Sequence, residues 1–246
     1  MDAVIIAAGY GSRLAALSPS KPLTPVCGMP MIEIGIRQAM AAGVSRVVVV
    51  TGHKAEDVEA FLAGLSQRLA IAIEPARVPD WSKPNGYSVM AGGARCAGDY
   101  LLLMADHLFE RDLLVGLLAT GEETRDVTLA IDQHVTNPLV DPDDATWVKT
   151  DAQGRITAIG KTIAPYDAVD CGAFLATPRL ASAIAEAIAA GKPGSLSDGM
   201  QVLADRRRAA THEIGGAWWM DVDDPRAHTL AEKLAPLHLG TALTQG

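Results

Sequence analysis

The sequence predicts an α/β fold in which a doubly wound, mostly parallel sheet is covered by helices on both faces. Two observations support this prediction. Short runs of Val, Ile and Leu recur through the first half of the chain, and segments with helical patterning alternate with them. The second half is less regular and reads as partly antiparallel strands, so we expect a mixed sheet.

Four buried strands separated by helices are expected in the first half. Pro30 and Gly43 bracket the first helix, as proline and glycine often do at helix starts and ends. Ligands in such sheets bind beyond the carboxyl ends of the strands. We expect strands at 2–7, 46–51, 69–73 and 99–104, and helices at 30–42, 55–64 and 86–96.

The second half is expected to add more strands and three helices. A hairpin-like turn covers 151–155 and contains Gly154, and Asp224 is well suited to cap a last helix that starts near Pro225. No repeat, linker or low-complexity tract divides the chain, so we expect a single domain over 1–246. The expected strands are 126–131, 144–150, 155–159, 169–176 and 210–214, and the expected helices are about 178–190 and 195–205.

Composition excludes several classes of protein. A chain of 246 residues with 49% hydrophobic content can bury a sizeable core, and a net charge of −8 without a basic block argues against nucleic-acid binding. The start has no basic region and no run is long enough to span a membrane, so we expect no signal peptide, no membrane insertion and a cytoplasmic location. Three separated cysteines predict neither a disulfide framework nor a zinc site.

A glycine-rich turn after the first strand predicts a triphosphate cradle. Residues 5–14 read Ile-Ile-Ala-Ala-Gly-Tyr-Gly-Ser-Arg-Leu, and Lys21-Pro22-Leu23 follow. Small residues let successive backbone N–H groups approach phosphate oxygens, while Arg13 and Lys21 supply positive charge. The spacing fits neither a Walker loop nor the dinucleotide fingerprint.

The whole string Ala-Ala-Gly-x-Gly-x-Arg-Leu plus Lys-Pro-Leu resembles the signature of nucleotidyltransferases that activate sugar and alcohol phosphates, the MobA-like NTP transferases. This resemblance implies a Rossmann-like nucleotidyltransferase (GT-A-like) fold. It also implies that the nucleotide is bound in the half over about 1–125 and its acceptor in the half over about 126–246. The nucleotide-binding residues implied here are Ala7, Ala8, Gly9 and Gly11.

Two acidic segments predict a Mg²⁺ site. Asp106 ends a buried apolar run, where it can bind Mg²⁺ with nucleotide phosphates or, alternatively, cap a helix that begins near Glu110. The corresponding family strand commonly ends Gly-Asp, and here Ala105 replaces that glycine. Asp221 and Asp223 would face one side of a strand, and the alternative to a metal site is a polar strand end that caps the last helix. They resemble the family's C-terminal Trp-x-Asp-x-Asp pattern, which implies a metal role without ranking the two.

Two loops are expected near the nucleotide. Asn85, Gly86 and Ser88 open a helix and can read a base or ribose, although an ordinary helix cap with a turn glycine explains them equally well. Gly52 and His53 match a family loop near the nucleotide, and a cap of the next helix is the alternative for His53.

The acceptor side resembles the inositol-1-phosphate cytidylyltransferases. There a Gly-Lys precedes a Tyr-x-x-Val-Asp-x-Gly-x-Phe stretch, matched here by Gly160-Lys161 and by residues 166–174. The resemblance implies that Lys161 binds the acceptor's phosphate. The alternative is that Lys161 is a solvated surface lysine. Asp170 and Gly172 of this stretch are then expected at the acceptor, where Asp170 either binds a hydroxyl or orients Lys161.

These expectations combine into one reaction, the transfer of CMP from CTP to an alcohol phosphate, with inositol 1-phosphate as the best single candidate. Arg13, Lys21, Asp106 and Lys161 are the expected catalytic residues, and self-association is left open. Alternatives of the same class are phosphocholine, 2-aminoethylphosphonate or a sugar 1-phosphate as acceptor. A non-catalytic nucleotide-binding regulator and a glycosyltransferase are the alternatives from other classes.

Overall fold

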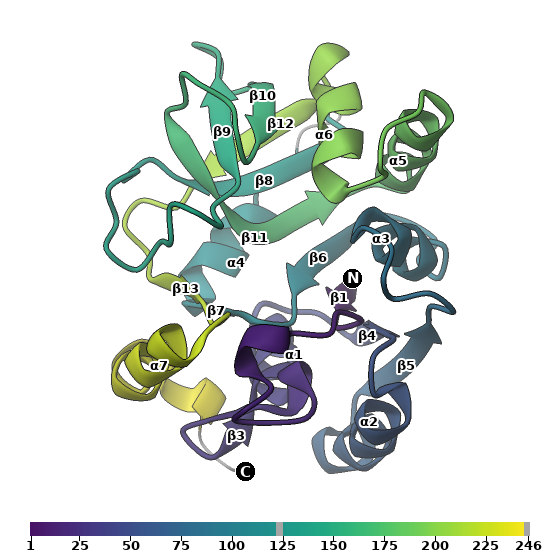
Figure 1. Ribbon diagram of the computed structural model, residues 1–246, viewed down its shortest axis with the longest axis vertical. Coiled ribbons are helices and arrows are strands. Elements are labelled where there is room, and N and C mark those ends of the chain that lie inside the picture. Colours follow the sequence, from purple (N-terminus) through teal and green to yellow (C-terminus); the bar gives the residue numbers. More distant parts are fainter. Residues whose placement is uncertain (122–124, 244–246) are drawn as a thin grey trace.

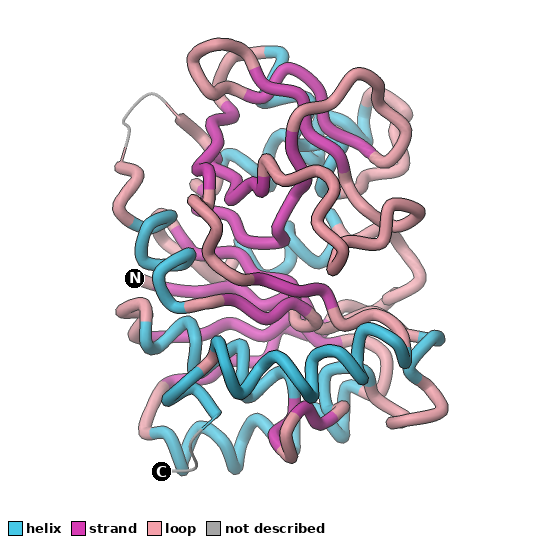
Figure 2. The backbone as a smooth tube through the Cα atoms, turned by 90° about the vertical axis from the view of Figure 1, so that its left-hand side faces the viewer, coloured by secondary structure: helices cyan, strands magenta, loops and turns pink. Residues whose placement is uncertain are grey.

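A mixed sheet joins the two halves of the chain (Figures 1 and 2). The computed structural model describes residues 1–121 and 125–243. In spatial order the strands are β10 (Ile156–Gly160), β9 (Trp147–Thr150), β11 (Ala168–Ala176), β6 (Tyr100–Met104), β1 (Asp2–Ile6), β4 (Arg46–Thr51) and β5 (Ala72–Arg77), with β8 (Val127–Asp132) beside β11 and β12 (Ala209–Glu213) beside β8.

The sheet is parallel through the first half and becomes mixed at β11. Strands β6, β1, β4 and β5 pair in parallel, as expected from their short apolar runs. The long strand β11 pairs antiparallel with β6, β8 and β9, while β12 adds a further parallel pair with β8. The predicted doubly wound, mostly parallel mixed sheet is therefore confirmed.

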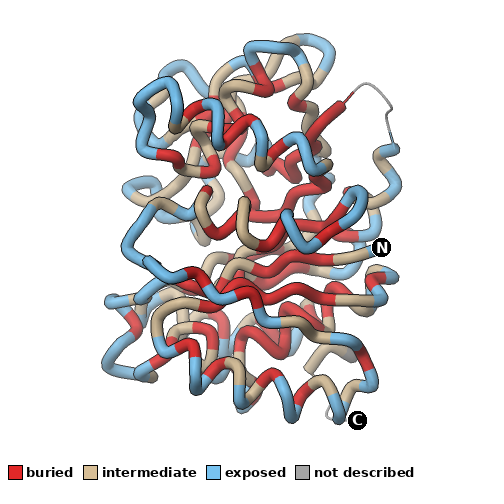
Figure 3. The backbone as a smooth tube through the Cα atoms, turned by 90° about the vertical axis from the view of Figure 1, so that its right-hand side faces the viewer, coloured by how far each residue is buried: buried red, intermediate tan, exposed pale blue. Residues whose placement is uncertain are grey.

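Helices cover both faces of the sheet. On β1, Ala3 and Ile5 pack into one hydrophobic cluster and Val4 into the other, because successive side chains of a strand point to opposite faces. Figure 3 shows the buried strands in the interior and the helices exposing one side each. Helices α1 (Met31–Ala41), α2 (Ala55–Leu69) and α4 (Arg111–Leu118) cover one face, and α3 (Gly86–Gly93), α5 (Arg179–Ala189) and α6 (Leu196–Asp205) the other.

The C-terminal helix α7 (Pro225–His238) returns to the N-terminal segments, beside α1 in Figure 1. A third hydrophobic cluster holds it there, with Ala231 and Ala235 packed near Leu14 and Met31. Asp224 caps the helix as predicted, since its Oδ1 accepts a hydrogen bond from Ala227 N at 2.7 Å. Short elements complete this region: β2 (Pro25–Val26), β3 (Met29–Pro30) and the 3₁₀ turns η1 (Ser12–Leu14), η2 (Lys21–Leu23) and η3 (Gly240–Leu243).

A two-stranded ribbon lies outside the main sheet, and neither its first strand nor its pairing was predicted. It consists of β7 (His107–Phe109) and β13 (Trp219–Asp221), paired antiparallel so that Asp221 lies opposite His107. The strand that was expected to carry both Asp221 and Asp223 ends at Asp221. Three-residue strands have no periodicity that a sequence pattern can detect. The ribbon joins the end of β6 to the C-terminal segment.

The other predicted helices and strands agree with the structure to within three residues at each end, except for the helix at 55–64 and the strand at 69–73. These two differences have one cause. The apolar run at 69–73 was expected to be a strand, but Leu69 ends α2, which was expected to stop at residue 64. Ala70 then takes a left-handed conformation, and β5 starts at Ala72. Because β5 is an edge strand and half-exposed, it lacks the apolar run that marks the central strands. Within 1–121 and 125–243, no helix combines the length and apolar character needed to cross a membrane.

Candidate active site

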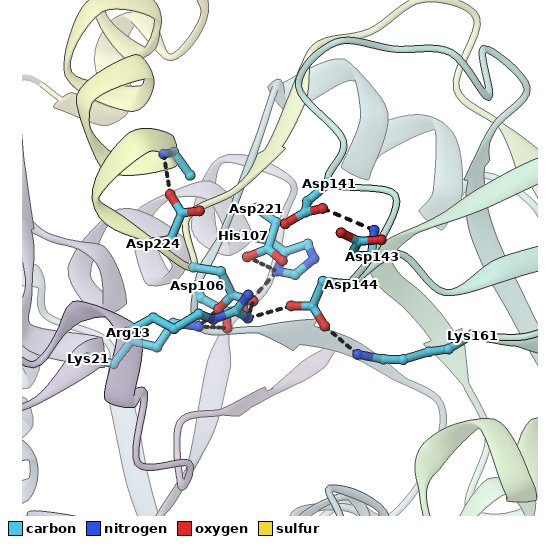
Figure 4. Close-up of polar contacts among 12 residues, drawn as sticks. Arg13, Lys21, Asp106, His107, Asp141, Asp143, Asp144, Lys161, Asp221 and Asp224 are labelled. Carbon is cyan, nitrogen blue, oxygen red and sulfur yellow. Dashed lines mark hydrogen bonds and ion pairs between the residues drawn. The ribbon is translucent and has the colours of Figure 1, made fainter.

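A cavity of about 280 Å³ opens at the carboxyl ends of the central strands, between the two halves of the chain. Its walls come from the N-terminal loop, the end of β6, the loop that precedes β9, and the segments around β11 and β13. Figure 4 shows the charged side chains that meet there. The predicted residues that line it are Arg13, Asn85, Asp106, Lys161, Asp170, Gly172, Asp221 and Asp223.

Where the N-terminal loop leaves β1, its backbone is held by β4 and by the loop that follows β4. Ala7 N–H donates to Val50 O at 2.9 Å, and Ala8 O accepts from His53 N–H at 2.9 Å. A Cβ on Gly9 would meet no described atom within 4 Å, so that face of the loop is open. Gly11 differs, because it has φ +62° and a Cβ there would lie 2.6 Å from Cδ of Lys21. Gly11 therefore makes room for the Lys21 side chain.

The two cations of this loop meet the predicted metal carboxylates. Lys21 Nζ lies 2.6 Å from Asp106 Oδ2 and also pairs with Asp223. Arg13 pairs with Asp223 and with Asp144. The side chain of Lys21 is only 13% exposed whereas that of Arg13 is 47% exposed. Lys21 therefore lies in the interior of this cluster of charges, and Arg13 lies at its solvent-exposed edge.

Asp106 and Asp221 meet through the β7–β13 ribbon, with His107 between them. His107 Nδ1 lies 2.7 Å from Asp106 Oδ1 and 3.7 Å from Asp221 Oδ1. Burial alone would lower the pKa of His107, but the charges of Asp221 and Asp106 outweigh it and raise that pKa to about 9. Burial raises the pKa of Asp106, but the Lys21 charge and the contact with His107 outweigh it, so that the net pKa is well below its usual range.

Asp221 lacks a complete set of partners. Its Oδ1 atom is buried and accepts no hydrogen bond from the described residues. Burial and the nearby charge of Asp106 raise the pKa of Asp221 to about 6, because an ionised carboxylate there is poorly compensated. A cation bound at this carboxylate would relieve both costs.

Carboxylate oxygens and one imidazole nitrogen form two overlapping groups that can hold a metal ion. Oxygen or nitrogen atoms of Asp106, His107 and Asp221 lie within 4.8 Å of one another, and so do oxygens of Asp144, Asp221 and Asp223. Asp221 is common to both groups. The three carboxylates predicted from the sequence thus converge on one corner of the cavity, and their oxygens suit a hard cation.

Lys161 and Asp170, the residues predicted for the acceptor, also line the cavity. Lys161 is more than half exposed and pairs with Asp144, while Asp170 Oδ1 accepts a hydrogen bond from Gly172 N at 2.7 Å. Burial raises the pKa of Asp170 to about 6. Lys161 and Asp170 thus have different protein partners, and Asp170 does not pair with Lys161 in the structure.

Asp144 was not predicted, yet it lies between Arg13 and Lys161 (Figure 4). One carboxylate oxygen pairs with Arg13 and the other with Lys161, so cations from the two halves of the chain share one side chain. The pKa of Asp144 is lowered, because these two partners outweigh the effect of burial. Its only sequence signal is the polar run Asp-Pro-Asp-Asp at 141–144, just before β9, and its meeting with Arg13 spans 131 positions.

Of the residues predicted in the two nucleotide loops, only Asn85 lines the cavity. Its Oδ1 accepts from Leu196 N at 2.8 Å, so it caps α6 and not its own helix. Gly86 packs closely against the 194–195 turn, and a Cβ there would lie 2.9 Å from Cγ2 of Ile184. Ser88 is buried. His53 does not cap α2, since no side-chain hydrogen bond caps that helix.

The family of this chain can now be assigned. A family model described as the MobA-like NTP transferase domain matches residues 3–197, well over half of the chain. The chain belongs to the MobA-like NTP transferase family. The family and the fold predicted from the glycine-rich motif are therefore both confirmed.

Two curated relatives illustrate what this MobA-like NTP transferase is similar to. It is 31% identical over 237 residues to the bifunctional IPC transferase and DIPP synthase of Rubrobacter xylanophilus. The alignment covers 95% of this chain and 52% of the relative. The chain is 34% identical over 158 residues to the CMP-5'-(3-aminopropyl)phosphonate synthase of Streptomyces rubellomurinus, covering 63% of this chain and 24% of that one. The chain therefore spans about half the length of the curated bifunctional relatives it matches.

The architecture also resembles a solved structure, the inositol-1-phosphate CTP transferase from T. maritima. The TM-score is 0.83, the two sequences are 23% identical, and the match covers 95% of each chain. At this identity the likeness establishes the shared fold.

Proposed function

We propose that this chain transfers CMP from CTP to the phosphate of a small alcohol, with release of pyrophosphate. The observation that supports this proposal best is the pair of contacts made by Asp144, whose two oxygens meet Arg13 and Lys161. Arg13, from the predicted triphosphate loop, and Lys161, predicted to bind the acceptor, thus share one carboxylate as their ion-pair partner. Two phosphates that must react with each other would be held side by side there.

The reaction needs positioning and charge neutralisation more than proton transfer. A phosphate monoester has a second pKa near 6, so its attacking oxygen is largely ionised at neutral pH. In this scheme Arg13 and Lys21 bind the triphosphate and Lys161 binds the acceptor's phosphate. The attacking oxygen is then aligned with the α-phosphorus, while fixed cations stabilise the charge of the leaving pyrophosphate.

We infer that Asp106, Asp221 and Asp223 hold Mg²⁺. Ligand atoms of Asp221 lie within 4.8 Å of those of Asp106 and His107 and, in a second group, of those of Asp144 and Asp223. Carboxylate oxygens suit this ion, and the buried unpartnered Oδ1 of Asp221 is the feature that favours it. When bound, the ion would neutralise phosphate charge at this corner. The protein's own contribution is to keep the carboxylates in place, through Lys21 on Asp106 and Asp223 and through the β7–β13 pairing.

The acceptor is proposed to be inositol 1-phosphate. The names of the IPC transferase relatives and of the T. maritima neighbour favour it. Among the described residues the cavity is lined by one tryptophan, Trp219, together with Phe174 and His107, and by no tyrosine. A single indole ring favours a neutral alcohol over a quaternary ammonium, which binds best between several electron-rich rings.

An aminoalkylphosphonate is the second candidate acceptor. A relative is named for 3-aminopropylphosphonate, and Asp170 offers a carboxylate that a primary ammonium group can bind without a cage. The two candidates differ in charge at the end remote from phosphorus. Asp170→Asn should therefore affect an aminoalkylphosphonate more than inositol 1-phosphate.

A substrate matrix tests the proposal. Each nucleoside triphosphate is combined with inositol 1-phosphate, phosphocholine, 2-aminoethylphosphonate and glucose 1-phosphate, with Mg²⁺, and pyrophosphate release is measured. We expect CTP with inositol 1-phosphate to give the highest rate. Asp106→Ala should abolish it, while Asp57→Ala, which removes an exposed carboxylate on α2, should not.

Other outcomes would overturn the proposal. Turnover of UTP or dTTP with a hexose phosphate, and none of CTP with any phosphoalcohol, would contradict cytidylyl transfer. CTP binding without pyrophosphate release from any combination would favour a regulatory nucleotide-binding protein. Glycosyl transfer from a finished sugar nucleotide would favour the glycosyltransferase alternative.

A further inference from the structure

Three aromatic rings meet at the carboxyl edge of the sheet, outside the cavity described above. Tyr10 follows β1, His53 follows β4 and Trp81 follows β5. The ring centroids of Tyr10 and His53 are 4.6 Å apart, and those of His53 and Trp81 are 5.2 Å apart, both pairs edge to face. Tyr10 and Trp81 are 6.0 Å apart with their planes tilted by 36°. We call these three residues the aromatic triad.

The backbone holds the triad in place through Gly52. A Cβ at Gly52 would lie 2.7 Å from Cβ of Trp81 and 2.8 Å from Ala8 O, closer than real Cβ contacts. The absence of a side chain therefore lets the loops after β1, β4 and β5 pack together. His53 N–H also donates to Ala8 O at 2.9 Å, which ties the triad to the glycine-rich loop.

Core packing does not account for the triad. Tyr10 is 48% exposed and Trp81 is 42% exposed, and the one other exposed large aromatic among the described residues is Tyr166. The Nδ1 atom of His53 is buried with no hydrogen-bond partner in the described chain. The triad thus leaves two aromatic rings in water and one polar atom unsatisfied, which is costly for a purely structural cluster.

We propose that Tyr10 and Trp81 form a stacking surface for the base of the nucleotide, and this inference rests on the proposed function. Tyr10 lies between Gly9 and Gly11, so one loop would touch the phosphates at its glycines and the base at its aromatic ring. The residues proposed for the acceptor, Lys161 and Asp170, line the cavity and the triad does not, whereas His53 N–H is bonded to Ala8 O of the glycine-rich loop. A planar base is the part of the nucleotide that an exposed aromatic pair recognises.

Stacking accounts for affinity and not for the choice of base. Every base presents a π-face, so the triad would hold any nucleotide whose phosphates fit the loop. Discrimination of cytosine then depends on hydrogen-bonding groups elsewhere. This separation gives the proposal a distinctive signature, because loss of the stack should weaken all bound nucleoside triphosphates by a similar factor.

Calorimetric titration of the full chain tests the stack, with CTP and inorganic tripolyphosphate as the two probes, each with Mg²⁺. Trp81→Ala should raise the Kd for CTP by roughly 5- to 140-fold, the factor that corresponds to one base–aromatic stack, and leave the Kd for tripolyphosphate unchanged. Trp81→Phe should restore most of the affinity. Tyr166→Ala is the matched control, since Tyr166 is 40% exposed and stacks on Trp147 at 4.1 Å, and its CTP affinity should be retained.

Three results would overturn the inference. An unchanged Kd for CTP in Trp81→Ala would mean that the base binds elsewhere. Equal losses for CTP and tripolyphosphate would mean that Trp81 only supports the loop. A similar loss in Tyr166→Ala would remove the specificity of the effect. If wild-type protein releases pyrophosphate from CTP while Trp81→Ala binds CTP normally, the stack fails and the proposed function stands; if wild-type protein binds no nucleoside triphosphate, the proposed function itself fails.

Discussion

Replacing Gly172 with alanine should disturb the candidate site through His107. Gly172 lies within β11 at φ +77°, and a Cβ there would collide with Cδ2 of His107 and lie 2.7 Å from its Nε2. The ring has little room to retreat. It stacks against Phe109 and Trp219 at 6.1 Å each, and its Nδ1 lies 2.7 Å from Asp106 Oδ1.

Two costs add for this substitution. Alanine in the left-handed region costs about 1–2 kcal/mol, and overpacking of a filled site costs about 1–3 kcal/mol, so the free energy of unfolding should fall by about 2–5 kcal/mol. A shifted His107 also loses its contact with Asp106. Loss of such an orienting contact typically lowers metal affinity or activity by about 10- to 100-fold.

Gly154→Ala is the matched control. Gly154 has a similar backbone, φ +69°, but a Cβ there would come no closer than 3.5 Å, to Oγ1 of Thr211, in a turn remote from the cavity. We expect the backbone cost of about 1–2 kcal/mol and unchanged pyrophosphate release. Urea unfolding of both variants, with activity normalised to folded protein, separates the two effects. If Gly172→Ala loses no more stability than Gly154→Ala, or loses stability with full activity, the argument through His107 is wrong.

Three further predictions concern charge at the site. Asp106→Ala should reduce Mg²⁺-dependent pyrophosphate release by about 100-fold or more with an unchanged circular dichroism spectrum, and near-wild-type activity at limiting Mg²⁺ would contradict its metal role. Lys161→Ala should weaken catalysis with the acceptor but leave CTP–Mg²⁺ binding unchanged, and Arg13→Ala should do the reverse; equal losses of CTP affinity by calorimetry would refute this division. Because the pKa of His107 is raised from 6.5 to about 9, its stabilisation is complete below pH 6.5 and is lost as the pH rises through 9. That shift corresponds to about 3 kcal/mol, so urea unfolding should show this decline in the wild type and not in His107→Gln.

The sequence predicted the central strands well because burial on both faces requires uninterrupted apolar runs. Strand β4, for example, is a run of four valines between Arg46 and Thr51. It predicted β5 poorly, because an edge strand with exposed positions has no such run. The family signature pointed to Arg13, Lys21 and Asp106; Arg13 and Asp106 line the cavity, and Lys21 contacts Asp106.

What the sequence could not predict are contacts made by irregular segments across long separations. Asp144 lies in a loop, where no periodicity indicates which way a side chain points, and its partner Arg13 belongs to the other half of the chain. Glycines were also ambiguous. Gly9 leaves open space, whereas Gly11 and Gly86 make room for neighbouring protein atoms, and only the packed structure distinguishes these roles.

The pairing of β7 with β13 has a consequence for how the molecule folds. His107 and Asp221 are direct partners in this ribbon although 113 residues separate them in the chain, so the loop that must close before they meet is long. Until the last segment docks, Asp106 and His107 would have no acidic neighbour from β13. We therefore expect the central sheet to form before the acidic corner, and a polypeptide shortened to end at residue 217 to lose Asp221 and Asp223 together with the packing of α7 near Leu14.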